Sequence, residues 1–237
     1  MLARLISQLA TLLFAVALTF ALLLATGRIE LAPRLNPFAP LDPRDGLGPF
    51  TSIKFTRARL DPALCRAALE RGGMRFEPVP DRQTGEGCGF TNAVRIIRFG
   101  EAMLSSPVVL SCPLALGLAM YERHGLQPAA RRHLSGPVTR IEHMGSYSCR
   151  NINHEAGGRR SRHATANALD IGGFGLAGGL RVTVAGSWRP PDAPTARFMR
   201  AARDAACRWF DVVLSPDYNA LHADHFHVDM GGGWACR

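Results

Sequence analysis

Apolar residues form one long uninterrupted run at the beginning of the chain. Between Leu5 and Gly27 no residue is charged, and Leu, Ala, Phe and Val dominate. At about 1.5 Å per residue, a helix of this length spans a hydrocarbon core of about 30 Å. A signal peptide usually has a shorter apolar region and a small-x-small cleavage site, of which residues 25–27 are a weak version. We therefore expect residues 1–28 to be an uncleaved membrane anchor, with a cleaved signal segment as the alternative.

The pattern changes sharply after this run. Residues 29–56 contain several prolines and little hydrophobic periodicity, which is typical of a semi-extended linker. From residue 57 to residue 237 short alternating stretches and helical stretches follow one another. Helices are expected from Pro62 to Gly72, from Pro113 to before Gly125, and over 194–210, while short strands are expected at 75–79, 92–98, 138–143, 168–171, 180–184, 212–214 and 225–229.

Helices and short strands are mixed without a repeating strand–helix unit, which favours an α+β fold. The glycine-rich stretch 172–179 is expected to be a turn between two strands. Together these patterns predict a single compact α+β domain over residues 57–237, after the N-terminal apolar helix and the linker.

Six cysteines follow the apolar run, and none lies inside it. An even number of cysteines downstream of an export signal predicts three disulfides in an oxidising compartment. Three of the cysteines precede residue 130 and three follow it, so an odd number of bridges must cross that midpoint if all of them pair. This favours one domain over two independent ones and leaves the pairing itself open. The six are Cys65, Cys88, Cys112, Cys149, Cys207 and Cys236.

The chain is basic, with 28 Lys plus Arg against 19 Asp plus Glu and a formal net charge of +9. Lys54 is its only lysine, and the arginines are scattered rather than gathered in a run. Scattered charge behind an export signal argues against a nucleic-acid partner. An anionic polymer of the cell envelope suits this charge at least as well.

Two histidine-rich segments contain the candidate chemistry. In the segment from His222 to Asp229, His225 and His227 alternate with apolar residues, as on a strand with one polar face. Polar groups buried on one face need compensation, and a metal ion supplies it, whereas an isolated pair of this kind would be two surface histidines.

The second segment runs from Ser161 to Asp170 and includes His163. Asp170 lies between Leu and Ile, where burial is costly unless the carboxylate is paired, metal-bound or accepting backbone hydrogen bonds in a turn. Two histidines and one carboxylate leave a tetrahedral zinc ion with an open position for water, which is the catalytic arrangement. Such a water ionises near neutral pH and can attack an amide carbonyl.

These segments resemble known families. Ser-x-His-x6-Asp (161–170) followed by His-x-x-His-x-His (222–227) is similar to the zinc metallopeptidases that include D-alanyl-D-alanine carboxypeptidases and murein endopeptidases, and to the hedgehog signalling domain. The runs 145–151, 163–171, 216–222 and 224–227 resemble more closely the bacterial extensin-like C-terminal domain family. The resemblance covers roughly residues 60–233 and implies a fold of the hedgehog/DD-peptidase type.

The resemblance also implies roles for individual residues. The implied ligands of one Zn²⁺ per chain are His163, Asp170 and His227. His225 would be a general base or transition-state donor, and Arg150 would bind a substrate carboxylate or the developing oxyanion, unless it is a structural arginine. The residues implied to lie behind these groups and orient them are Ser161, His222 and Asp224.

One position departs from the peptidase pattern. These peptidases usually have glycine three residues after the first ligand, where this chain has Ala166. The additional methyl group is expected to narrow the substrate cleft. The glutamate of the related Glu-x-x-His motif is also absent, so no glutamate base is expected.

The function expected from these features is zinc-dependent hydrolysis of amide bonds in peptidoglycan stem peptides or cross-links. The domain would lie on the periplasmic side of the bacterial inner membrane, held by the N-terminal helix or secreted after signal cleavage. The alternative is a non-catalytic, metal-containing module that binds or supports the cell envelope. The scissile bond and the oligomeric state stay open.

Overall fold

The computed structural model describes residues 1–237 and divides them into two compact units. The first unit contains Met1–Leu41 and Asp45–Arg57, and the second contains Asp42–Arg44 and Ala58–Arg237. Each unit is described separately below.

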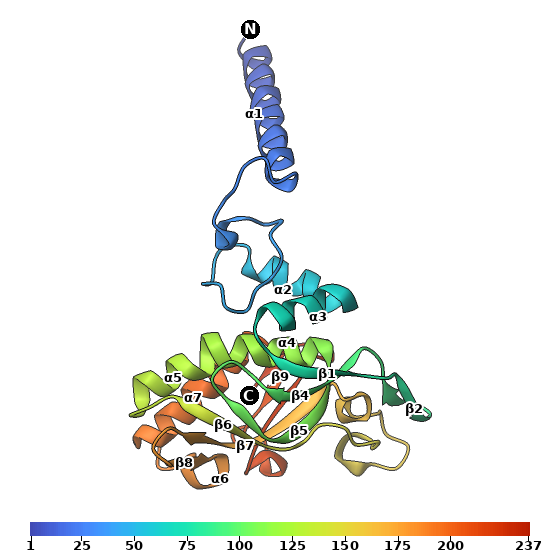
Figure 1. The fold of residues 1–237 in the computed structure, drawn as a ribbon, viewed down its shortest axis with the longest axis vertical. Helices are drawn as coiled ribbons and strands as arrows, with labels where there is room; N and C mark the ends of the chain where they lie inside the picture. The colour runs from blue at the N-terminus through green and yellow to red at the C-terminus, as the bar shows by residue number, and fades with distance from the viewer. The chain divides into compact units, whose positions relative to one another are not determined.

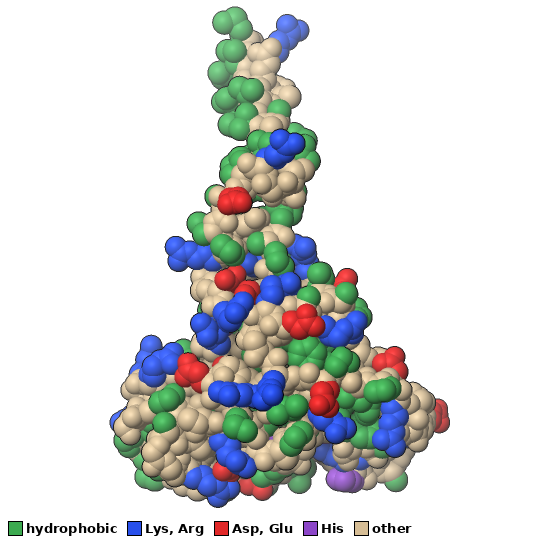
Figure 2. Space-filling model, viewed as in Figure 1, with side chains coloured by type: hydrophobic (Ala, Val, Ile, Leu, Met, Phe, Trp, Pro, Cys, Tyr) green, Lys and Arg blue, Asp and Glu red, His purple; other side chains and the backbone are tan.

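The first unit is dominated by the apolar helix α1 (Leu2–Ala25). Within this helix of 24 residues, a stretch of 18 residues has a mean hydropathy of 2.2, so the helix is long and apolar enough to cross a membrane. Only 6% of that stretch is buried within the protein. A membrane anchor and a signal sequence both fit this description. Apolar side chains cover the helix along its length (Figure 2).

The segment that follows α1 is more regular than expected. The linker was predicted over residues 29–56. A 3₁₀ turn, η1 (Pro33–Leu35), lies near its beginning, and the helix α2 (Thr51–Leu60) overlaps its end. The Lys54 ammonium donates to the Pro33 carbonyl at 2.9 Å, and the Arg57 guanidinium donates to the Pro37 carbonyl at 3.0 Å. These contacts fold the proline-rich chain back on itself. The hydrophobic pattern did not predict α2, because its apolar residues form no clear stripe along one face of the helix.

The second unit is built on a mixed nine-stranded sheet (Figure 1). Its strand order is β1-β4-β5-β6-β7-β10-β9-β11, with β8 also paired to β7. The pairs β5–β6 and β9–β11 are parallel and all others are antiparallel. The strands are β1 (Arg75–Val79), β4 (Ala93–Arg98), β5 (Met103–Ser111), β6 (Val138–Gly145), β7 (Ala168–Leu176), β8 (Arg181–Thr183), β9 (Val212–Leu214), β10 (Phe226–Asp229) and β11 (Ala235–Cys236). A separate hairpin joins β2 (Arg82–Gly85) to β3 (Cys88–Phe90).

Helices cover one face of this sheet (Figure 1). They are α3 (Pro62–Arg71), α4 (Cys112–Tyr121), α5 (Gln127–His133) and α7 (Pro194–Ala206), with the short α6 (Val184–Ser187) beside them. Phe198 of α7 meets Phe174 of β7 edge to face, with ring centroids 5.5 Å apart. The expected α+β class is therefore confirmed, with a mixed sheet behind a helical layer.

Several sequence signals identified helix ends correctly. Asp61 accepts hydrogen bonds from the backbone of Ala63 and Leu64, so it caps α3 as expected, and Ser111 caps α4 in the same way. Gly125, however, does not end the second helix. The chain continues through a π-helical turn, η2 (Glu122–Leu126), into α5. A Cβ at Gly125 would lie 2.8 Å from the Ala205 methyl, so this glycine allows two helices to approach closely rather than stopping one.

The expected glycine-rich turn at 172–179 is also corrected. Strand β7 continues through Gly172, Gly173 and Gly175 to Leu176, and the turn uses only Gly178 and Gly179, both at φ +89°. A Cβ at Gly173 would lie 2.8 Å from the Val182 carbonyl of β8. Gly173 thus permits close strand contact, which a sequence pattern cannot distinguish from a turn.

All six cysteines pair, as expected. The bridges are Cys65–Cys112, Cys88–Cys149 and Cys207–Cys236. Only the second crosses residue 130, which satisfies the odd-number condition. Together with the apolar helix, these disulfides point to a protein outside the cytoplasm.

Replacing Cys65 and Cys112 together with serine is expected to lower the free energy of unfolding by about 2–5 kcal/mol. This bridge closes 47 residues and both sulfurs are fully buried, so serine would also leave hydroxyls in an apolar site. The matched control replaces Cys207 and Cys236, which close 29 residues and are partly exposed. Urea unfolding of each purified variant measures the difference. A larger loss in the control pair would contradict this ranking.

Candidate metal centre

Three side chains from two neighbouring strands and a loop converge at one point. Asp170 of β7 and His227 of β10 are directly opposite each other in the antiparallel register. Such cross-strand neighbours have Cβ atoms about 4.5–5.5 Å apart, so their side chains meet. His163 lies in the 3₁₀ turn η4 (Arg162–Thr165), and its own backbone N–H donates to the Ser161 hydroxyl, which caps the turn. Ser161 thus positions the turn that holds the first histidine.

The distances within this group fit a small tetrahedral ion. His163 Nε2 lies 3.2 Å from His227 Nδ1 and 3.2 Å from Asp170 Oδ2. His227 Nδ1 lies 2.9 Å from Asp170 Oδ1. Zinc–ligand bonds of about 2.0–2.1 Å at tetrahedral angles place two ligand atoms about 3.3 Å apart. One nitrogen or oxygen from each of these side chains can therefore bind a shared metal ion, since the three ligand atoms all lie within 4.8 Å of one another.

Hydrogen bonds on the far side of each ring determine which nitrogen faces the centre. His163 Nδ1 lies 2.5 Å from the Ser146 carbonyl, which can only accept, so Nδ1 donates and Nε2 keeps its lone pair. His227 Nε2 lies 3.1 Å from Asp229 Oδ2 and donates to that carboxylate. With both histidines neutral, the centre holds two lone pairs and the Asp170 carboxylate, and no donor. Three facing acceptors need a cation between them.

The pKa shifts in the metal-free centre also indicate that a positive charge is needed between these three side chains. Burial opposes the charge on His227, but hydrogen bonds to Asp170 and Asp229 outweigh it and raise its pKa to about 9. Burial likewise disfavours the Asp170 carboxylate, yet its bonds to His163 and His227 hold its pKa well below the usual range. Without a metal, a proton on His227 thus takes the place of the missing cation.

The structure places His225 next to these three residues but outside their group. His225 precedes β10, and its Nε2 lies 3.6 Å from Asp170 Oδ1. Its Nδ1 lies 2.8 Å from Asp224 Oδ1, so Asp224 orients this ring. The strand expected over 225–229 begins only at Phe226, so His225 precedes it, and Asp229 contacts the outer nitrogen of His227.

His222 lies close to both His225 and His227. It ends the 3₁₀ turn η5 (Ala220–His222), and its ring centroid is 5.2 Å from that of His225. Burial is the main cause that lowers the pKa of His222 to about 4, and the charge of Arg150 acts in the same direction. His222 is therefore neutral at pH 7, and its Nδ1–H donates to the Asn219 side-chain carbonyl at 2.7 Å.

A cleft of about 490 Å³ opens onto this centre and is lined in part by His222, His227 and Asp229. Arg150 also lines it, half-buried, and its side chain forms no hydrogen bond or ion pair within the chain. A guanidinium held beside a metal centre without a partner can bind an anion there. The structure thus brings Arg150 to the cleft that His222 and His227 line.

Ala166 does not narrow this cleft, contrary to expectation. Its methyl group is fully buried and packs with Phe90 and Ala93 in a small apolar cluster. Its backbone has φ +51° and ψ 27°, in the left-handed region that glycine adopts without penalty. A preference for glycine at this position therefore follows from the backbone and not from room for a substrate.

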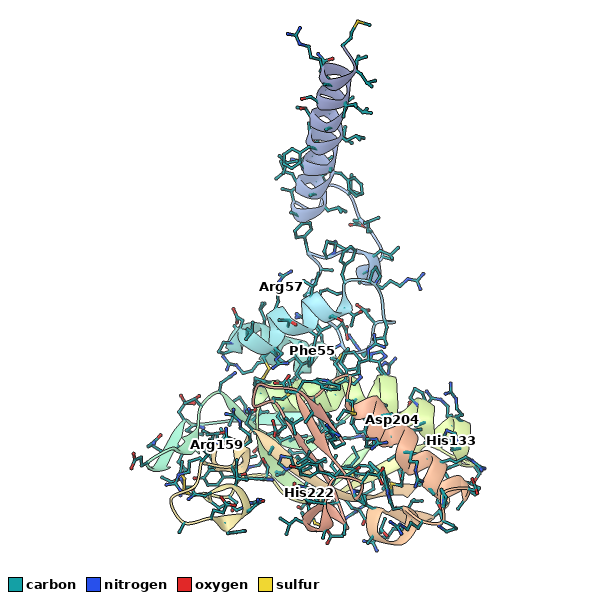
Figure 3. The ribbon with its side chains drawn as sticks, turned by 180° about the vertical axis from the view of Figure 1, so that it is seen from behind. Phe55, Arg57, His133, Arg159, Asp204 and His222 are labelled. Carbon is teal, nitrogen blue, oxygen red and sulfur yellow. A yellow bond between two sulfur atoms is a disulfide. The ribbon has the colours of Figure 1, made fainter.

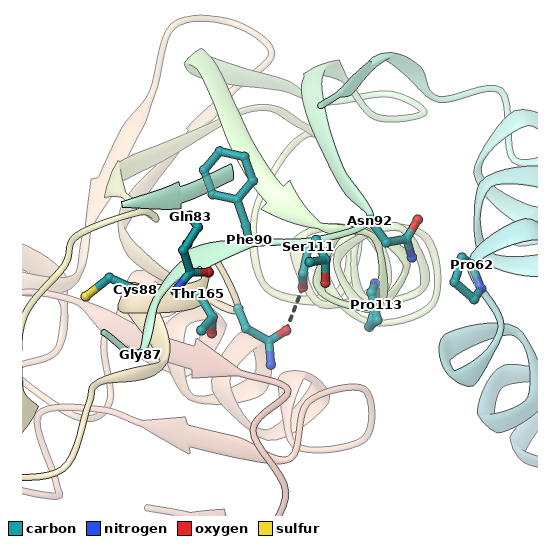
Figure 4. Close-up of a pocket in the computed structure, with 12 residues that line it drawn as sticks. Pro62, Gln83, Gly87, Cys88, Phe90, Asn92, Ser111, Pro113 and Thr165 are labelled. Atoms are coloured by element: carbon teal, nitrogen blue, oxygen red, sulfur yellow. Dashed lines mark hydrogen bonds between the residues drawn. The ribbon is translucent and has the colours of Figure 1, made fainter. Parts of the chain in front are cut away.

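The opposite side of the same loop lines a second cavity, of about 520 Å³. Figure 4 shows Thr165 and Ser111 among the residues that line it, and the Ser111 hydroxyl donates to the Asn167 side-chain oxygen at 2.6 Å. No charged side chain lines this cavity. The polar part of its lining consists of neutral amides and hydroxyls, whereas the cleft beside the candidate metal centre is lined by arginines and histidines.

Two partners of the centre were missed by sequence reasoning. In the sequence, Asp229 was recognised only as the last residue of the histidine-rich segment 222–229. In the structure its carboxylate accepts from His227 Nε2–H and so fixes the tautomer of His227. The Ser146 carbonyl, which fixes His163, carries no sequence signal because it is a backbone atom. A search for an acid two residues after the last histidine would have found Asp229.

Comparison with known proteins identifies the family and leaves the activity open. No curated protein and no solved structure matches the chain. The family model described as extensin-like protein C-terminus matches residues 63–237, which include all six cysteines, Arg150 and the three candidate ligands. This chain therefore belongs to the extensin-like protein C-terminus family.

Proposed function

We propose that the domain is a zinc-dependent hydrolase of amide bonds in the stem peptides or cross-links of bacterial peptidoglycan. The observation that carries the proposal is the set of three acceptors at tetrahedral spacing, with both histidine tautomers fixed from outside. Neutral histidine nitrogens and one carboxylate are the donor set of catalytic zinc sites, which keep a fourth position open. A zinc ion held there would act as a Lewis acid toward water and the amide carbonyl.

His225 suits the proton transfers that amide hydrolysis needs. Asp224 accepts from its Nδ1–H, which leaves Nε2, on the side of Asp170, as the nitrogen that can exchange a proton. This nitrogen can take a proton from the attacking water and return it to the leaving amine, as a general base and then a general acid. The exposed Asp224 carboxylate stabilises the charged ring between the two steps.

Arg150 supplies the anion-binding group of the proposal. Its unpaired guanidinium in the cleft wall can bind a carboxylate near the scissile bond or the oxyanion that develops at the carbonyl. Amide bonds beside free carboxylates are abundant in peptidoglycan stem peptides, and a domain outside the cytoplasm meets that polymer. We place the domain in the periplasm, with residues 1–28 as a membrane anchor, residues 29–56 as a linker and residues 57–237 as the catalytic domain.

Zinc-loaded full-length protein is expected to release muropeptide fragments from isolated sacculi, and mass spectrometry of the soluble fraction measures them. Chelation and His163→Ala should both abolish release, because each removes the metal. Arg132→Gln, an exposed change on α5, is the matched control and should leave release intact. A folded, metal-loaded protein that binds sacculi but yields no new fragments would replace this proposal with the envelope-binding module.

A further inference from the structure

The cleft beside the metal centre has one wall made by a short hairpin, residues 149–162, which we name the arginine arm. Its two sides are joined by a β-bridge between Asn151 and Arg160. Backbone hydrogen bonds from Ile152 to Arg159, at 2.9 Å, and from Ser161 to Arg150, at 3.0 Å, close the hairpin. The arm contains four arginines, all of which line the cleft: Arg150, Arg159, Arg160 and Arg162.

The arm is tied to the rest of the domain at several points. The Cys88–Cys149 disulfide joins its first residue to strand β3. Arg160 donates to the Glu86 carbonyl at 3.0 Å, and its aliphatic part lies where a Cβ of Gly87 would be. Arg162 donates to the Gly231 carbonyl beyond β10. The arm is therefore a fixed wall, and its charges are presented without the entropic cost of ordering a loose loop.

No carboxylate neutralises these four charges. None of the four arginines forms an ion pair. Arg160 and Arg162 donate to uncharged carbonyl and amide oxygens, and Arg159, like Arg150, makes no side-chain hydrogen bond within the chain. Asp229 is the only acid that lines the cleft, and it already accepts from His227 and from the Gly231 backbone.

An anion bound at Arg150 would neutralise only one of these four positive charges and would leave the other three arginines without an anionic partner. Arg159 is exposed and lines the same cleft as His222, and both residues are labelled in Figure 3. Guanidinium groups bind carboxylates through paired, charge-assisted hydrogen bonds, and Arg159 has all of its donors available. The cavity on the other side of the loop, with its neutral lining, offers no alternative place for an anion (Figure 4).

We infer that Arg159 forms a second anion subsite, which selects stem peptides carrying a further free carboxylate beyond the one near the scissile bond. This inference rests on the proposed function and names its substrate class as acidic peptides. Arg159 determines affinity for that carboxylate and takes no part in the proton transfers, which belong to His225. Arg160, Arg162 and the Cys88–Cys149 bridge hold the subsite in position.

The test compares two peptides that differ in one group. The first is a stem peptide whose D-glutamate carboxylate is free, and the second is the same peptide with that carboxylate amidated. Calorimetry with zinc-loaded full-length protein carrying His225→Ala measures binding without turnover. The free form is expected to bind about tenfold more tightly, the size of one charge-assisted contact at an exposed site. Adding Arg159→Gln should remove this preference, while adding Arg132→Gln on α5 should keep it.

The outcomes separate this inference from the proposed function. Equal binding of the two peptides, a preference that survives Arg159→Gln, or one that Arg132→Gln also removes would overturn the second subsite. If the preference depends on Arg159 and no amide bond is hydrolysed by the unaltered protein, the subsite stands and the hydrolase proposal fails. With unaltered His225, Arg159→Gln should raise KM for the free peptide about tenfold and leave kcat unchanged, because the contact is the same before and during reaction.

Discussion

Replacing His163, Asp170 or His227 with alanine is expected to reduce bound zinc from one per chain to a trace. Each supplies one of only three protein ligands, and the remaining pair cannot complete the centre. Asp229→Asn is expected to lower the affinity for zinc about 10–100-fold, because an uncharged amide replaces the carboxylate that accepts the hydrogen bond from His227 Nε2–H. Metal analysis after dialysis against a graded chelator measures all four variants.

His225→Ala is the matched control, since it removes a neighbouring histidine that is not among the ligands. It should keep zinc and lower the rate of amide hydrolysis about 10²–10⁴-fold, the usual contribution of a general base. Asp224→Asn should have a smaller effect in the same direction, because it removes only the orienting contact at 2.8 Å. Loss of zinc in His225→Ala together with retention in His227→Ala would mean that the two histidines are assigned the wrong way round.

Local signals in the sequence were sufficient for much of the fold. Caps such as Asp61 and Ser111 predict helix starts because the side chain of each accepts a hydrogen bond from a backbone N–H two or three residues further along the chain. Strand β1 was predicted at its observed bounds. Gly125 and Gly173 were misleading because each is required by a close contact with another element, Gly125 with α7 and Gly173 with β8. Composition cannot distinguish such a close approach from a turn.

In the candidate metal centre, too, some residues could be recognised from short sequence motifs, whereas others depend on how the chain folds. Residue types and spacing within two short segments indicated a metal site, and the resemblance to zinc peptidases selected His163, Asp170 and His227 as its ligands. The β7–β10 register places Asp170 and His227 opposite each other, and the turn η4 brings His163 to them. The partners that fix their tautomers are of two kinds. Asp229 lies in the motif itself, whereas the Ser146 carbonyl depends on how the chain before η4 is folded, and no side chain reports that.

The metal-free protein is expected to lose stability as the pH rises from about 6.5 to about 9, whereas the zinc-bound protein is not. In the metal-free fold His227 is protonated between two carboxylates, with a pKa raised to about 9 from 6.5 in the unfolded chain. A pKa raised by folding stabilises the fold fully below the unfolded value, and this contribution disappears as the pH passes the folded value. The difference corresponds to about 3 kcal/mol.

Zinc reverses this dependence because it binds the deprotonated nitrogen that the proton otherwise occupies. The affinity for zinc should therefore increase over the same pH interval, and the stabilisation by zinc should be small at pH 6 and large at pH 9. Unfolding midpoints measured with excess zinc and with chelator at pH 6, 7.5 and 9 check this directly. Asp229→Asn removes one of the two carboxylates that raise the His227 pKa, so its metal-free form should show a weaker decline. A metal-free protein that becomes more stable between pH 6.5 and 9 would contradict the assignment of His227 as the group that exchanges a proton for the metal.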